Sequence, residues 1–341
     1  MKNVAIIGQS PAVHAAVKAL LERDPSLGIT VISCDGQRPY DRMLLPGLID
    51  RSVKEKDIFC APVDYYTSAQ VQLVLDKEIQ RVNFVRHRVF CADKAQVDFD
   101  GLIIADAPHL RLPQFKGIRR QGVFNLARFA SVKALIAYLA FTETVVIEPL
   151  GFAGIRAALA LKAVGKEVLV SVRDEGLLTG LIPPERATAL SKALEQRGVR
   201  VIVSSGGITD IIGENEVKAV RLKSGKVVAC DMVVLEDVAP DMRFVGETEL
   251  AVMDRIPVTD ALLSNMPGVY AMDITAQIDM FQYSGQNWLD TDTGSAQASV
   301  AAANMLGEEK KLMASDLASR DILETFFHPQ ELVITSSEMV A

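Results

Sequence analysis

The chain has 341 residues, of which 49% are hydrophobic and 23% are charged, and its formal net charge is −7. This length allows two or three domains with cores of their own, and the composition is that of an ordinary globular protein. The negative charge argues against nucleic acid or an anionic membrane surface as the main partner. No apolar run approaches the ~20 residues that a membrane span needs, and the N-terminal run is too short for a signal peptide.

Cysteine and histidine residues show no spacing that is typical of a metal or redox centre. The four cysteines lie far apart and form neither C-x-x-C nor an iron–sulfur pattern: Cys34, Cys60, Cys91 and Cys230. We therefore expect reduced, mostly buried thiols in a cytoplasmic protein. The four histidines show no H-x-x-H, H-E-x-x-H or triad order, so nothing supports metal or nucleophilic catalysis.

The first 110 residues predict a βαβ unit, then a small antiparallel layer, then a buried parallel strand. The expected elements are strands at 3–8 and 28–33, a helix at about 11–22, short alternating strands at 71–75, 88–91 and 95–99, and a strand at 101–106.

The same order of elements starts again about 140 residues later, which indicates an internal duplication. The expected elements are a strand at 143–149, a helix at 152–165, a strand at 166–172, a helix near 184–197, and further strands at 199–204, within 217–230 and at 231–236.

The last part of the chain is less regular. A short strand is expected at 268–273 and a helix rich in small residues at 293–307, with Gly307 at its end. The final thirty or so residues contain a polar helix and the run "QELVIT", which the sequence places in neither half.

The first strand leads into "AIIGQSPAV", which has the spacing of a dinucleotide phosphate loop. Gly8 permits a tight turn, Ser10 is small enough for close approach to a pyrophosphate, and Val13 replaces the small residue that packs helix against strand. The helix N-terminus supplies amide donors and partial positive charge for the anion. The alternative is a tight strand-to-helix turn that binds nothing.

Two features after the second strand favour the nucleotide. Asp35 lies where a carboxylate would bind a ribose hydroxyl, and "RPYDRMLLPGLI" follows it. In this order the residues resemble the opening of the FAD/NAD(P)-binding pyridine nucleotide-disulfide oxidoreductase family, in its branch of rubredoxin and ferredoxin reductases and the flavin portion of assimilatory nitrite reductase.

The resemblance covers roughly residues 1–310 and implies an α/β fold of two Rossmann-like domains, the second inserted in the first. It implies an FAD-binding domain of 1–110 and 240–310, an NAD(P)-binding-like domain of 111–239, and a C-terminal tail of 311–341. The residues that it assigns to FAD are Gly8, Ser10, Pro11, Asp35, Arg42 and Asp273.

Two motifs depart from the family pattern. The family's A-T-G reads Ala105-Asp106-Ala107 here, which adds a charge that must be solvated or paired. The glycine before Asp273 is replaced by Met272, which adds bulk beside the expected flavin.

The second phosphate loop lies in "VVIEPLGFAGIR", residues 145–156. Gly151 and Gly154 keep the roles of close approach and close packing, whereas Pro149 stands where the first glycine is expected. Proline has a fixed φ and no N–H. Either the turn has another shape or the nucleotide lies further out, so that binding is modified and weakened.

The end of the following strand bears on the choice between NADP and NAD. Val172 stands where NAD-binding members have an acid, and Arg173 comes next. The pair resembles members that prefer NADPH, in which an arginine meets the 2′-phosphate. The alternative is a surface arginine at a strand end.

Arg156 is the candidate catalytic residue. Many relatives have a glutamate there, paired with a lysine near the flavin, but here the lysine position is Gly47. Arg156 would bring its charge near the nicotinamide or flavin, or else cap the site.

The resemblance also bears on the electron acceptor. The segment "PYDRMLLPG" has no cysteine pair, which excludes disulfide chemistry. We also expect a C-terminal truncation, in which the family's C-terminal interface domain is absent. We expect FAD-dependent transfer of electrons between NAD(P)H and an iron–sulfur or rubredoxin-like protein, within a hetero-oligomer. The alternative is a degenerate Rossmann subunit that serves a redox complex only as a docking scaffold.

Overall fold

The structure is a computed structural model that describes residues 1–105, 115–179, 181–203, 205–236, 242–278, 291–317 and 327. It divides into two compact units. The first contains Met1–Asp41, Phe59–Arg111 and Ala239–Arg320, and the second contains Arg42–Ile58 and Leu112–Val238. Expected features at 106–114 and beyond 317, including His109 and "QELVIT", lie outside the described residues.

The first unit is built on a parallel sheet of five strands in the order β17-β7-β1-β2-β3. The bounds of its elements are β1 Asn3–Ile7, α1 Pro11–Arg23, β2 Gly28–Ile32, α2 Val63–Ser68, β3 Gln72–Val74, β4 Ile79–Asn83, β5 Arg88–Cys91, β6 Gln96–Asp98, β7 Gly101–Ile104, β16 Ile256–Val258, β17 Val269–Ala271, β18 Ala276–Ile278 and α6 Thr291–Met305.

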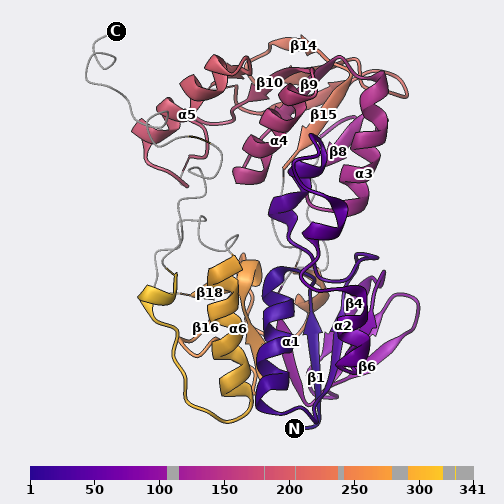
Figure 1. Cartoon of the computed structure of the whole chain (residues 1–341), viewed down its shortest axis with the longest axis vertical. Coiled ribbons are helices and arrows are strands. Elements are labelled where there is room, and N and C mark those ends of the chain that lie inside the picture. The colour runs from indigo at the N-terminus through magenta and orange to yellow at the C-terminus, as the bar shows by residue number, and fades with distance from the viewer. Residues whose placement is uncertain are drawn as a thin grey trace. The chain divides into compact units, whose positions relative to one another are not determined.

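Two helices of the first unit run side by side next to this sheet, α1 and α6 (Figure 1). α1 starts with Pro11 at its first position, where a missing N–H costs nothing. Small residues allow the close approach, since a Cβ on Gly294 would lie 3.0 Å from the Cβ of Ala12. The small-residue helix predicted from the sequence thus packs against the helix that follows the first phosphate loop.

The small antiparallel layer is confirmed, but its membership differs from the prediction. It consists of β4, β5 and β6, which pair in antiparallel fashion. The expected strand at 71–75 is β3, which instead pairs in parallel with β2 at the edge of the large sheet. Its alternating pattern is as typical of a half-exposed edge strand as of an antiparallel layer.

The second unit repeats this plan with a parallel sheet in the order β8-β15-β9-β10-β11. The bounds of its elements are η1 Arg42–Leu48, η2 Glu55–Ile58, β8 Val123–Asn125, α3 Phe129–Tyr138, β9 Thr144–Glu148, α4 Phe152–Ala163, β10 Glu167–Ser171, α5 Pro184–Gln196, β11 Arg200–Ile202, β12 Ile208–Ile212, β13 Ala219–Leu222, β14 Val227–Ala229 and β15 Met232–Leu235.

The duplication predicted from the sequence is confirmed by this topology. Each unit pairs a five-stranded parallel sheet with a three-stranded antiparallel sheet, the latter formed in the second unit by β12, β13 and β14. β1 and β9 hold the central positions, and each leads into the helix that follows a phosphate loop, α1 or α4. The two loops can therefore be compared position by position.

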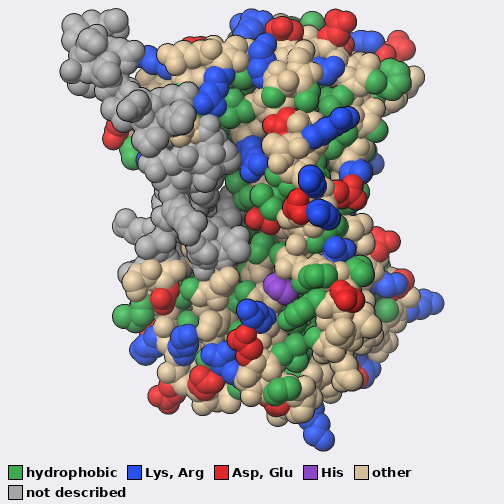
Figure 2. Space-filling model, in the orientation of Figure 1, with side chains coloured by type: hydrophobic (Ala, Val, Ile, Leu, Met, Phe, Trp, Pro, Cys, Tyr) green, Lys and Arg blue, Asp and Glu red, His purple; other side chains and the backbone are tan. Residues whose placement is uncertain are grey.

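The described surface carries both signs of charge. On the face shown in Figure 2, basic and acidic side chains are interspersed. None of the helices in the described parts of the chain is long and apolar enough to cross a membrane.

Candidate functional site

The first phosphate loop has the geometry that the sequence predicts for a tight turn. Gly8 has φ +136°, a conformation that glycine adopts without strain, and its N–H donates to the carbonyl of Ile32 at 3.0 Å. Ser10 follows as the N-cap of α1, and Pro11 is the first residue of the helix. The amides of the first helical turn therefore open at the carboxyl edge of the sheet, where anions bind helix N-termini.

Asp273 lies at the same place, although it comes from the other end of the first unit. The Ser10 hydroxyl donates a hydrogen bond of 2.6 Å to the Asp273 carboxylate, and both side chains are buried. The backbone N–H of Asp273 donates to Gln297 of α6 at 2.7 Å. Asp273 also has φ +56°, which is unusual for a residue other than glycine and is often found at functional sites.

Asp35 completes the polar group at the end of β2. Its carboxylate is buried and accepts a hydrogen bond of 2.9 Å from the hydroxyl of Tyr40. Tyr40 belongs to the "RPYDR" segment, and its backbone N–H donates to the carbonyl of Gln9 at 3.0 Å. The segment is thus tied to the phosphate loop on one side and to the ribose-binding candidate on the other.

Two buried polar atoms near these elements have no hydrogen-bond partner among the described residues, Gln9 Nε2 and Thr293 Oγ1. Gln9 lies inside the phosphate loop, and Thr293 lies in the first turn of α6. Because a buried polar atom without a partner is costly, such atoms indicate that a polar ligand completes the site. The residues of the first unit therefore fit a dinucleotide such as FAD.

The second phosphate loop is different, because a side chain of the same unit occupies it. Glu236 directly follows β15, and its Oε2 accepts hydrogen bonds from the backbone N–H groups of Leu150, Gly151 and Gly154, at 3.1, 2.9 and 2.8 Å. Burial raises the pKa of Glu236 to about 7, against the lowering effect of these donors. The carboxyl group takes the place at α4 where a phosphate would bind.

The two glycines of this loop make room for Glu236. A Cβ on Gly154 would lie 2.2 Å from Glu236 Oε2 and 2.7 Å from the Cβ of Pro149. A Cβ on Gly151 would lie 2.9 Å from Glu236 Oε1. The sequence predicts close approach for Gly151 and close packing for Gly154, and here the group that lies against both glycines is a carboxyl of the chain. As it stands, this loop does not fit a pyrophosphate.

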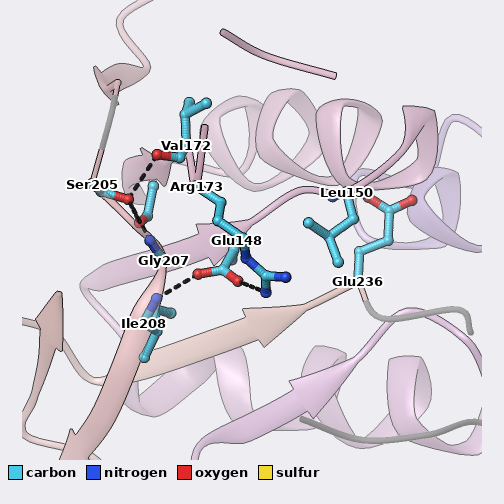
Figure 3. Close-up of polar contacts among 9 residues, drawn as sticks. Glu148, Leu150, Val172, Arg173, Ser205, Gly207, Ile208 and Glu236 are labelled. Carbon is cyan, nitrogen blue, oxygen red and sulfur yellow. Dashed lines mark hydrogen bonds and ion pairs between the residues drawn. The ribbon is translucent and has the colours of Figure 1, made fainter. Parts of the chain in front are cut away.

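Arg173 is also engaged. Its guanidinium forms an ion pair with Glu148, the last residue of β9, whose other oxygen accepts the N–H of Ile208 at 2.6 Å. Figure 3 shows the Glu148 carboxylate between these two partners. Glu148 is buried, whereas the Arg173 side chain is 43% exposed. The predicted contact of Arg173 with a 2′-phosphate stays a prediction.

The strand register changes one comparison between the halves. Ile32 and Ser171 are the last residues of β2 and β10. Counted from these strand ends, the residue that corresponds to Asp35 is Asp174, which is exposed, and not Val172. The preference for NADPH that the sequence analysis attached to Val172 and Arg173 stays a prediction.

Arg156 lies on α4, which packs against η1. A Cβ built on Gly47 would lie 2.8 Å from Nη2 of Arg156 and 2.5 Å from Cγ2 of Val53. The two positions of the family's lysine–glutamate pair are therefore adjacent, with arginine in one and glycine in the other. Arg156 also lines a cavity of about 640 Å³ together with Asp50, Lys162 and Arg197. Its catalytic role stays a prediction.

The remaining candidates add little chemistry. Arg42 begins η1 and groups with the second unit, so its expected role at the flavin also stays a prediction. Burial raises the pKa values of the Cys60 and Cys230 thiols to about 12, which is the opposite of a reactive thiolate. No group of three or more His, Cys, Asp or Glu residues among those described could hold a metal ion.

Sequence reasoning did not single out Tyr40, Glu148 or Glu236. A signal for both glutamates was present, since each acid ends or directly follows a run of buried apolar residues at the carboxyl edge of a parallel sheet. A charge in that place needs a partner, and the loop amides and Arg173 provide it.

Comparisons with known proteins find relatives that match most of the chain. The chain is 25% identical to an NADH oxidase of Methanocaldococcus jannaschii over 90% of its own length and 70% of that protein. It is 24% identical to human apoptosis-inducing factor 3 and to rhodocoxin reductase of Rhodococcus erythropolis. These two matches include 91% and 76% of this chain, but they span only 52% and 60% of the length of the two relatives.

Solved structures show the same fold at low sequence identity. A ferredoxin reductase for the CYP199A2 system of Rhodopseudomonas palustris has a TM-score of 0.82 at 20% identity, covering 92% of this chain and 78% of that one. NADH:rubredoxin oxidoreductase of Clostridium acetobutylicum has a TM-score of 0.73 at 20% identity, with coverage of 92% and 77%.

The family model described as pyridine nucleotide-disulphide oxidoreductase matches residues 2–303. This match confirms the predicted family, the class of oxidoreductase and the α/β fold of two dinucleotide-binding units. The chain belongs to the pyridine nucleotide-disulphide oxidoreductase family.

Proposed function

We propose that this protein is an FAD-dependent oxidoreductase, or an electron-transfer subunit, that moves electrons between NAD(P)H and an iron–sulfur or rubredoxin-like protein. The hydrogen bond of 2.6 Å between Ser10 and Asp273 carries the proposal. It joins the first phosphate loop to the end of β17, at the edge of the sheet where open α/β folds bind their ligands.

The described residues of the first unit would hold the flavin nucleotide by simple electrostatics. The N-terminal amides of α1 would face the pyrophosphate, and Ser10 leaves room for it. The Asp35 carboxylate, held in place by Tyr40, would accept a ribose hydroxyl. FAD supplies hydride acceptance and one-electron release, and the protein supplies position and charge.

A separate protein is the proposed electron acceptor. The names of relatives include a ferredoxin–NAD(+) reductase subunit of a benzene dioxygenase system and a covalent putidaredoxin reductase–putidaredoxin complex. Among the described residues no group of three or more His, Cys, Asp or Glu could hold a metal ion, and burial raises the pKa values of the Cys60, Cys91 and Cys230 thiols. A cytoplasmic hetero-oligomer with an iron–sulfur protein therefore remains our proposal for the working assembly.

The absorption spectrum of the purified protein tests the proposal. We expect about one FAD per chain after reconstitution and gel filtration. Anaerobic NADH or NADPH should reduce this flavin, and a ferredoxin or rubredoxin should then reoxidise it. A protein that retains no flavin when FAD is supplied in excess contradicts the proposal.

A second candidate function is favoured by Glu236, which fills the second phosphate loop. In this alternative the chain carries flavin within a redox complex as a docking subunit and does not itself oxidise a pyridine nucleotide. Dithionite would then reduce the bound flavin completely, while neither NADH nor NADPH would reduce it at any concentration.

A further inference from the structure

The N-terminus of α4 has the donors of a phosphate site, and the chain satisfies them itself. Three backbone N–H groups, those of Leu150, Gly151 and Gly154, point at one oxygen of Glu236. α4 is a helix of 12 residues, so its dipole adds partial positive charge at the same point. A bound phosphate oxygen would use these same donors, and it cannot share them with Glu236.

The first unit provides an internal comparison. Ala105 and Glu236 take equivalent places, because each directly follows a matching strand, β7 or β15. The N–H of Ala105 donates to Ile7 at 3.0 Å, and the N–H of Glu236 donates to Glu148 at 3.4 Å. The alanine side chain is too short to reach the N-terminus of α1. Among the described residues, Glu236 fills the loop at α4, whereas Ala105 leaves the loop at α1 open.

A second pair in the same unit points the same way. Arg173 is the candidate for recognising a further phosphate, and its guanidinium is held by the buried carboxylate of Glu148. Glu148 also accepts the N–H of Ile208, so its position is fixed by the backbone as well as by the ion pair. Figure 3 shows the contact of Arg173 with Glu148. The helix N-terminus and Arg173, which would attract a nucleotide, thus both contact carboxyl groups of the same unit.

We propose that Glu236 is a built-in competitor for the pyrophosphate of a pyridine nucleotide, so that a nucleotide enters the second unit only when Glu236 leaves the N-terminus of α4. This deepens the proposed function, on which it rests for the identity of the nucleotide. The wild-type protein should bind pyridine nucleotides weakly, and removal of the Glu236 side chain should strengthen binding.

The test is calorimetric titration with ADP-ribose, which carries the pyrophosphate of NAD but cannot transfer a hydride. Excess FAD is present, so that the first unit is filled. We expect Glu236→Ala to bind ADP-ribose at least tenfold more tightly than the wild type. Glu236→Gln is the matched control, because its amide oxygen still accepts the loop N–H groups, and it should stay within about threefold of the wild type.

Equal affinity in the wild type and Glu236→Ala, whether tight or weak, overturns the proposal. Flavin content is read separately from the absorption spectrum of each sample. A protein without flavin whose affinity for ADP-ribose still rises in Glu236→Ala would contradict the proposed function and leave the role of Glu236 standing.

The wild-type protein gives an independent measurement if Glu236→Ala does not fold. Amide resonances of Gly151 and Gly154 report directly on the group bound at α4. We expect them to stay unshifted while ADP-ribose is raised to concentrations that saturate ordinary dinucleotide sites. Saturating shifts of both resonances at micromolar ADP-ribose would show that Glu236 does not compete.

Discussion

The Ser10 hydroxyl and the Asp273 carboxylate lie 2.6 Å apart, although 263 positions separate them in the chain. Their contact places the end of β17 against the phosphate loop that follows β1. Asp273 has a backbone conformation that few residues other than glycine adopt, and its N–H is fixed by Gln297. These two hydrogen bonds hold Asp273 in this conformation.

Substitutions at Ser10 test this arrangement. Ser10→Glu puts a second carboxylate beside Asp273 and in the space for the pyrophosphate, so the protein should lose FAD binding altogether. Ser10→Ala loses one hydrogen bond and keeps the space, so FAD binding should weaken by about 1 kcal/mol. Flavin retained after gel filtration measures both. If Ser10→Glu retains its full flavin content, this loop does not bind the pyrophosphate of FAD.

The raised pKa of Glu236 makes the stability of the protein depend on pH. Its pKa is about 7 in the folded chain and 4.5 in the reference state, so the folded state binds the proton more tightly. Its contribution is fully present below pH 4.5 and is lost as the pH rises to 7, by about 3 kcal/mol. Denaturant unfolding between pH 4.5 and 8 measures it.

Glu236→Gln supplies the control for this dependence, because glutamine does not titrate. As the pH rises from 4.5 to 7, the free energy of unfolding of the wild type should therefore fall relative to that of Glu236→Gln. A difference that is constant with pH would mean that Glu236 is ionised throughout this range.

Gly151 and Glu236 should show a strong energetic coupling. A Cβ at position 151 would meet Glu236 Oε1 at 2.9 Å, and it would meet no other side chain as closely. We expect Gly151→Ala to destabilise the protein by about 1–2 kcal/mol in the wild type and by much less in Glu236→Ala. A double-mutant cycle of unfolding measures this coupling. Additive effects of the two substitutions would mean that the Glu236 side chain does not lie against Gly151.

Arg173 should matter for stability before any nucleotide binds. Arg173→Ala leaves the buried Glu148 with the Ile208 N–H as a partner but without its ion pair. We expect a loss of about 1–3 kcal/mol, limited because Arg173 is partly exposed to solvent. Glu148→Gln in the Arg173→Ala background should recover part of it, since no charge then remains buried. If Glu148→Gln recovers none of the lost stability, the loss comes from the packing of the Arg173 side chain alone.

Much of the fold could be predicted from the sequence because two periodicities repeat. The buried runs before Gly8 and Gly151 have the pattern of parallel strands, and the helices after them begin at recognisable turns. The placement of Gly8, Ser10 and Asp35 at one edge of the first sheet was predictable for the same reason, since these residues follow the strand order of a dinucleotide fold.

The second site was not predictable, because its decisive contact joins distant parts of the chain. Glu236 comes 82 residues after Gly154, and only the pairing of β15 with β9 brings the two together. Sequence spacing shows that a loop can bind phosphate, but not that a side chain already fills it.

The visible absorption spectrum during anaerobic addition of NADH tests the account most directly. Reconstituted wild-type protein should show bound oxidised flavin that NADH bleaches slowly and only at high concentration, and Glu236→Ala should bleach at least tenfold faster at the same NADH concentration. Fast bleaching at low NADH in the wild type, unchanged by the substitution, or the absence of flavin from both proteins would contradict it.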